Sequence, residues 1–102
     1  MKRYVCALSD VAPGHLKAAT VEGRQLCVAR VADGDVYVVS DTCSHEDSSL
    51  SEGEIVECEV ECSAHLARFD LRSGAAMCEP ADRPIQTFVV TVENDEIYVD
   101  LD

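Results

Sequence analysis

Short runs of apolar and β-branched residues, separated by turn signals, fill most of the chain. The run at residues 36–39 (Val-Tyr-Val-Val) follows Asp33 and Gly34, a dipeptide whose glycine accepts the positive φ of a tight hairpin turn. Residues 25–31 alternate only partly between apolar and polar, which indicates a strand buried on both faces. We expect strands over residues 4–8, 16–21, 25–31, 36–39, 54–56, 59–61, 69–71, 75–77, 87–92 and 97–99.

The turn signals recur too often for a helix of more than a turn or two. We therefore predict a single all-β domain over residues 1–102, built from stacked antiparallel sheets around one modest core. No apolar run approaches the roughly 20 residues of a membrane span. The apolar stretch after Lys2 and Arg3 is too short for a signal peptide, so we expect a cytoplasmic protein.

The chain is strongly acidic, with 8 basic residues against 20 acidic ones and a net charge of −12. Such a surface repels nucleic acid phosphates and anionic membranes, so neither is an expected partner. The acidic residues could serve solubility, or they could dock the protein on basic surfaces of larger proteins. The composition is compatible with both readings.

Two short pairs of metal-binding residues stand out: Cys43 with His45, and Cys62 with His65, with sixteen residues between the pairs. Two kinds of site use two sulfur and two nitrogen ligands. One is a tetrahedral zinc ion. The other is a Rieske-type [2Fe-2S] cluster, in which two Cys hold one iron and two His hold the other. Zinc motifs commonly pair Cys with Cys and His with His, whereas each pair here offers one of each, which favours the cluster.

Four further cysteines lie outside this motif. Six Cys in a short chain could suggest a disulfide framework, but the absence of a secretory signal argues against it. Cys6 and Cys27 lie in apolar, strand-like runs, where Cys acts as a small buried hydrophobe. Cys58 and Cys78 lie near the proposed site, and either could be a redox-sensitive thiol. The plain structural interpretation is favoured for all four.

Around the ligand motif the chain resembles the Rieske ferredoxins, the small electron carriers of bacterial aromatic-ring dioxygenases. The resemblance includes residues 50–53 (Leu-Ser-Glu-Gly), residues 68–74 (Arg-Phe-Asp-Leu-Arg-Ser-Gly) and a loop around Pro80. It implies the Rieske [2Fe-2S] fold, with a small cluster-binding subdomain over residues 41 to about 78. It also implies one cluster per chain, with Cys43 and Cys62 on the inner iron and His45 and His65 on the outer iron.

By this resemblance the chain is a ferredoxin that carries single electrons from a flavin-containing ferredoxin reductase to a terminal aromatic-ring-hydroxylating oxygenase. We expect a monomer, and basic docking surfaces on both partners. We do not expect an enzyme: beyond His45 and His65 only His15 remains, too few for a mononuclear iron site of two His and one carboxylate. The alternatives are a structural zinc module and an accessory subunit similar to the small subunit of nitrite reductase.

Several positions depart from related patterns. Respiratory-type members carry a disulfide and hydroxyl donors around the cluster, and the matching positions here are Ser48, Ala64, Ala67 and Phe69. Fewer donors to the sulfurs stabilise the reduced cluster less, so these residues indicate a low reduction potential. Glu46 and Leu66 stand where ferredoxins commonly have glycine, which leaves the geometry of both loops open.

Overall fold

The computed structural model describes residues 2–41, 49–62, 67–77 and 84–101. Two short 3-10 helices, η1 (Leu8–Asp10) and η2 (Leu50–Glu52), interrupt the strands. None of the helices in the described ranges has the length and apolar character needed to cross a membrane. The strands are β1 (Lys2–Ala7), β2 (His15–Val21), β3 (Arg24–Arg30), β4 (Val36–Ser40), β5 (Glu54–Val56), β6 (Glu59–Glu61), β7 (Arg68–Asp70), β8 (Thr87–Phe88), β9 (Val90–Glu93) and β10 (Glu96–Asp100).

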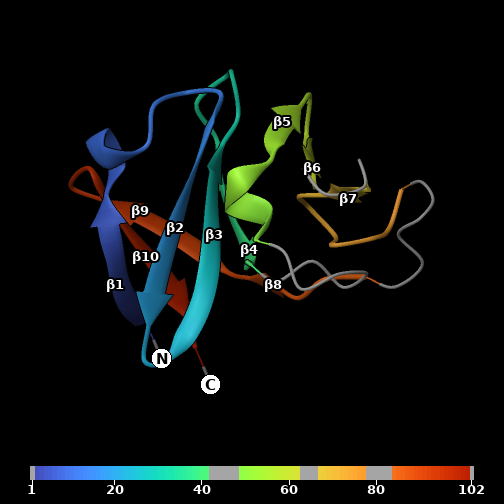
Figure 1. The fold of residues 1–102 in the computed structure, drawn as a ribbon. Helices are drawn as coiled ribbons and strands as arrows, with labels where there is room; N and C mark the ends of the chain where they lie inside the picture. Colours follow the sequence, from blue (N-terminus) through green and yellow to red (C-terminus); the bar gives the residue numbers. More distant parts are fainter. Residues whose placement is uncertain (1, 42–48, 63–66, 78–83, 102) are drawn as a thin grey trace.

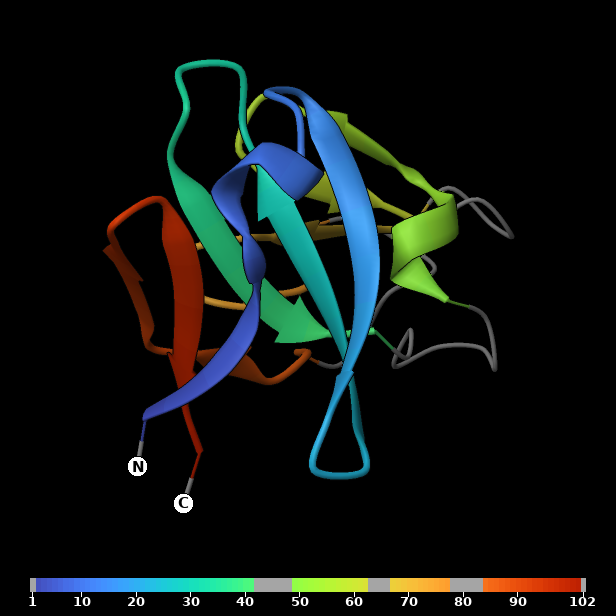
Figure 2. The same cartoon turned by 90° about the vertical axis from the view of Figure 1, so that its left-hand side faces the viewer.

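These strands form three antiparallel sheets, ordered β1-β10-β9, β2-β3-β4-β8 and β5-β6-β7. The sheet of β2, β3 and β4 lies between the other two (Figure 1). The expected all-β fold of stacked antiparallel sheets is confirmed. The β5-β6-β7 sheet comes between β4 and β8 in the chain, and in Figure 2 it lies behind β2 and β3. Whether an inserted subdomain has the limits 41 and 78 stays a prediction.

Strand β3 contributes side chains to two hydrophobic cores, one on each face of the middle sheet. Its central residues are all buried, as the incomplete alternation of this segment predicted. Alternate side chains of a strand point to opposite faces, so Leu26 and Val28 pack on one side while Cys27 and Ala29 pack on the other. We name the first side core B (Cys6, Val11, Val21, Leu26, Val28, Val38, Ile97, Val99 and Leu101). The other side is core A (Cys27, Ala29, Val31, Val39, Leu50, Val60, Cys62, Ala67, Phe69, Leu71 and Ile85).

The hairpins confirm the turn signals, with one change of detail. Asn94 and Asp95 both have positive φ (52° and 61°), as a two-residue turn between β9 and β10 requires. The turn with Gly34 (φ 101°) is three residues long, because Val31 N–H donates to Asp35 O at 2.9 Å across it. The expected hairpin is present, with one more residue at its tip.

Two strand predictions were wrong. Residues 87–92 do not form one strand: β8 pairs with β4, whereas β9 pairs with β10, and Val89 between them is 70% exposed. The chain changes sheets at Val89, which an unbroken β-branched sequence does not reveal. Residues 75–77 make only an isolated bridge, between Ala76 and Phe69. Gly74 directly before them has a φ of +78°, and the turn it makes leaves little length for a regular strand.

Candidate metal centre

Cys62 is the one member of the expected ligand set within the described residues. It follows β6 directly and its side chain is fully buried (0% exposed) in core A. Its N–H donates to Ala67 O at 2.7 Å, so the second ligand loop is closed at its root. A buried sulfur at the root of a loop suits the inner iron of a Rieske-type cluster, because thiolate is the ligand that iron–sulfur clusters require.

The other three ligands, Cys43, His45 and His65, lie outside the described residues, so the complete ligand set stays a prediction. Within the described ranges no group of three or more His, Cys, Asp or Glu residues could hold a metal ion. The structure describes residues that flank these ligands in the chain, and two of them, Leu50 and Cys62, lie in core A.

The root of the first ligand loop is bracketed by Asp41, which is only 5% exposed. Leu50 N–H donates to Asp41 O at 2.7 Å, and Ser51 N–H donates to Asp41 Oδ1 at 2.8 Å. Asp41 N–H donates in turn to Gln25 O at 3.1 Å, which ties the bracket to β3. The residues on either side of the segment that carries Cys43 and His45 are therefore held together at Asp41.

Met77 and Ile85, the residues nearest to a third segment, are both anchored by backbone hydrogen bonds near β7. Met77 N–H donates to Arg68 O at 2.8 Å before it, and Ile85 N–H donates to Gly74 O at 2.8 Å after it. The proposed lid position, Pro80, falls between these contacts and lies outside the described residues. The roots of all three segments reach core A, which contains Leu50, Cys62 and Ile85.

Two glycines allow these roots to approach closely. A Cβ on Gly53 would lie 1.8 Å from Glu61 O, on the residue before Cys62. A Cβ on Gly74 would lie 2.1 Å from Ile85 O, and Gly74 also has a positive φ of 78°. Both contacts are with backbone atoms, so no rotamer change could relieve them. Both glycines lie in segments that carry the family resemblance, and close approach is a physical reason for them.

Two of the four positions that indicate a low potential are described. Ala67 and Phe69 are both fully buried in core A, and neither side chain carries a hydroxyl that could donate to a cluster sulfur. Ser48 and Ala64, together with the glycine replacements Glu46 and Leu66, lie outside the described residues. The low reduction potential stays a prediction.

The outer face of the β5-β6-β7 sheet concentrates negative charge. In its register Glu54 lies opposite Glu61, and Glu59 lies opposite Asp70. Arg68 offsets part of this repulsion, because its Nε donates to Glu61 Oε2 at 2.9 Å. Like charges directly opposite one another destabilise a sheet, so this face keeps its charge at the expense of stability.

The thiols away from the ligand set agree with the structural interpretation. Cys6, Cys27 and Cys58 are all free, and Cys6 and Cys27 are buried, as expected of small hydrophobes. Burial, with a smaller contribution from the charge of Asp41, raises the pKa of Cys27 to about 12. Burial likewise raises the pKa of Cys6. Cys58 is partly buried, and Cys78 lies outside the described residues.

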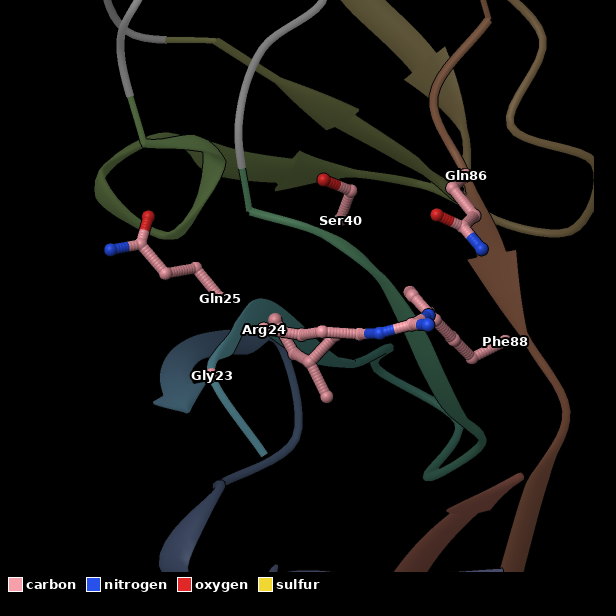
Figure 3. Close-up of a pocket in the computed structure, with 7 residues that line it drawn as sticks. Gly23, Arg24, Gln25, Ser40, Gln86 and Phe88 are labelled. Carbon is pink, nitrogen blue, oxygen red and sulfur yellow. The ribbon is translucent and has the colours of Figure 1, made fainter. Parts of the chain in front are cut away.

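A surface groove of about 530 Å³ opens beside the root of the first ligand loop (Figure 3). It is lined by Gly23, Arg24, Gln25, Leu26, Ser40, Gln86 and Phe88. Two of these lining residues are joined directly, since Ser40 N–H donates to Gln86 O at 2.8 Å. Because Ser40 directly precedes Asp41, the groove backs onto the bracket of that loop. Sequence reasoning gave no sign of this groove.

Comparison with known proteins places this geometry among small redox proteins. The chain is 40% identical over 98 residues to the ferredoxin component of a biphenyl 2,3-dioxygenase from Rhodococcus jostii (strain RHA1), covering 96% of this chain and 91% of that protein. It is 37% identical over 95 residues to the ferredoxin component of a naphthalene 1,2-dioxygenase system from Pseudomonas putida, covering 93% and 90%. A solved complex of reduced oxygenase and oxidized ferredoxin in carbazole 1,9a-dioxygenase contains a similar chain, with a TM-score of 0.88, 36% identity and coverage of 96% and 91%.

These relatives are ferredoxin components, and the present chain is likewise an electron carrier rather than a catalytic subunit. The model of the Rieske [2Fe-2S] domain matches residues 1–89, which confirms both the expected fold and the expected cofactor, one [2Fe-2S] cluster per chain. A structural zinc module is therefore set aside. With most of its length matched and the buried Cys62 at the root of a ligand loop, the chain belongs to the Rieske [2Fe-2S] domain family.

Proposed function

We propose that this ferredoxin takes single electrons from a flavin-containing reductase and passes them to a terminal aromatic-ring-hydroxylating oxygenase. Cys43 and Cys62 would hold the inner iron as thiolates, and His45 and His65 would hold the outer iron. The observation that carries the proposal is the placement of Cys62, fully buried where the second loop leaves core A. The protein acts as a monomer in the cytoplasm.

The ligand assignment explains which end of the molecule exchanges electrons. Cys62 is buried in core A, so the iron that the two thiolates would hold would lie inward, and the iron that the two imidazoles would hold would lie outward. Replacing two thiolates by neutral imidazoles removes negative charge from the cluster, which raises its potential above that of all-Cys clusters. An imidazole edge on the outward iron would offer a short path to a partner's acceptor.

The partner assignment is supported by the relatives. One is a ferredoxin seen in complex with its oxygenase, and two others are components of aromatic dioxygenase systems. The acidic outer face of the β5-β6-β7 sheet is the surface that complementary basic residues of a partner would meet. Charges at the rim of such an interface mainly accelerate encounter, and salt screens them.

The direct test is the spectrum and metal content of the purified protein. We expect a reddish-brown protein with two irons and two acid-labile sulfides per chain, and a Rieske-type EPR signal after reduction with dithionite. Cys62→Ala and His65→Ala should each abolish this signal, whereas Cys58→Ala, a change at a free thiol, should keep it. A colourless protein with one bound zinc would overturn the ligand assignment.

The carrier role is tested separately, by stopped-flow mixing of the reduced ferredoxin with a Rieske-type ring-hydroxylating oxygenase. We expect reoxidation within milliseconds to seconds and dependent on oxygenase concentration. Full cluster loading without any electron transfer to such an oxygenase would refute this role while leaving the ligand assignment intact.

A further inference from the structure

Asp41 differs from every other acidic residue that the structure describes, because it alone is buried. The remaining carboxylates of the described ranges are at least partly exposed to solvent. Burying a carboxylate is unfavourable unless its oxygens are hydrogen bonded. A buried acidic side chain in a chain with a net charge of −12 therefore calls for an explanation.

Asp41 makes three hydrogen bonds that hold the ends of the first ligand loop in place. The N–H fixes Asp41 to Gln25 on β3, the C=O accepts from Leu50, and Oδ1 accepts from Ser51. Two of these bonds reach across the whole first loop to the residues just after it. Asp41 thus links the two ends of the first loop, and one of the two linking hydrogen bonds is made by its charged side chain.

The same residue lies two positions before Cys43 in the chain. Two residues span at most about 7 Å in any conformation, so the carboxylate cannot lie far from the inner iron if Cys43 is its ligand. Low solvent exposure weakens screening of the charge. The charge also makes a smaller contribution, after burial, to the raised pKa of Cys27 on β3.

We infer that Asp41 is a positioning residue for the cluster, which both brackets the first ligand loop and holds the reduction potential low with its buried negative charge. The inference rests on the ligand assignment proposed above. Adding an electron gives the cluster one more negative charge, which a neighbouring carboxylate disfavours. Removing the carboxylate charge should therefore make the cluster easier to reduce.

Two substitutions separate the two roles. Asp41→Asn keeps a side-chain oxygen that can accept from Ser51 N–H but removes the charge. Asp41→Ala removes both the charge and the acceptor. Asp35→Asn is the matched control, since Asp35 is exposed in the β3–β4 turn and the substitution makes the same change in charge.

The measurements are made on the loaded protein, by protein-film voltammetry and by the rate of iron release to a chelator. For a unit charge about 10 Å away at an effective dielectric constant of about 20, the equilibrium constant for one-electron reduction should rise about tenfold in Asp41→Asn. A tenfold change corresponds to about 59 mV, towards positive potential. Asp35→Asn should leave the potential almost unchanged, and Asp41→Ala should also release iron at least tenfold faster than Asp41→Asn.

The inference is overturned if Asp41→Asn binds two irons but has the potential of the Asp35→Asn control. It is also overturned if Asp41→Ala releases iron at the wild-type rate. If Asp41→Asn does not load, Asp41→Glu keeps the charge, and its potential must then stay at or below that of the wild type for the inference to stand. Failure of the ligand assignment would look different, because the wild-type protein itself would lack the cluster.

Discussion

Replacing Gly53 with alanine should destabilise the protein more than its small size suggests. The added methyl group would lie 1.8 Å from Glu61 O, 3.0 Å from Glu61 C and 3.2 Å from Leu50 O, all of which are backbone atoms. The φ of Gly53 is −90°, so the penalty comes from steric overlap and not from a left-handed backbone. Relief requires β5 to move away from β6 at the residue that precedes Cys62.

Overpacking that forces the backbone to shift costs about 1–3 kcal/mol, and we expect the upper end here because no side chain can yield. For a chain of this length, about 3 kcal/mol lowers the melting temperature by roughly 10–20 °C. The assay is thermal unfolding followed by circular dichroism, together with iron content per chain. We expect less than full loading, because the strain falls at the roots of two ligand loops.

Gly34→Ala provides the control for glycine replacement in general. Gly34 has a positive φ of 101°, but no atom lies within 4 Å of the position its Cβ would take. This variant should lose only about 1–2 kcal/mol, the cost of a left-handed backbone for an L-residue, and should load iron normally. If Gly53→Ala melts within a few degrees of the wild type, or no lower than Gly34→Ala, the close approach is not what Gly53 provides.

Three further predictions concern the core, the buried thiol and the surface. Phe69→Ala, at a fully buried position of core A, should cost about 3–5 kcal/mol and reduce iron loading, both measurable on the purified variant. Because the folded pKa of Cys27 is about 12 against 9.0 for a free thiol, the folded state holds that proton more tightly. Its contribution to stability is therefore complete below about pH 9 and falls by up to about 1.4 kcal/mol per pH unit towards pH 12. Urea unfolding of wild type and Cys27→Ala should show this difference, and parallel pH profiles would contradict it. Electron transfer to the oxygenase should slow as salt rises, and Glu54→Lys should weaken that dependence more than Glu96→Lys on β10; equal slopes would show that the acidic β5-β6-β7 face serves solubility alone.

Much of the fold could be read from the alternation of side chains. The incomplete alternation of residues 25–31 predicts a strand buried on both faces, and the structure places a core on each side of β3. The hairpin at Asn94 and Asp95 followed from turn chemistry that depends only on neighbouring residues. Turn residues therefore predict a hairpin whose contacts are all between residues close in sequence.

The errors came from interactions between segments distant in sequence. Nothing in residues 87–92 marks Val89 as the point where the chain leaves β4 and joins β10, because both halves are equally suited to a strand. The sequence analysis did not single out Asp41, whose burial depends on three backbone partners on other segments. Of the site, the sequence motif identified candidate ligands, but not the contacts that hold the loops.

The arrangement of the two cores suggests why the loops are held by backbone contacts. Among the described residues, core A contains Leu50, Cys62 and Ile85 from the roots of all three segments, while core B contains none of these root residues. The two cores share β3 and β4, whose alternate side chains serve both. The loop roots are thus fixed to a sheet that is packed on both faces, and a sheet held in this way resists deformation. An electron carrier needs that rigidity, because a site whose ligands move little between oxidation states loses little energy to reorganisation in each transfer. Backbone hydrogen bonds hold the loop roots rigid, for example from Cys62 N–H to Ala67 O and from Leu50 N–H to Asp41 O. These bonds leave the side chains free to face the cluster.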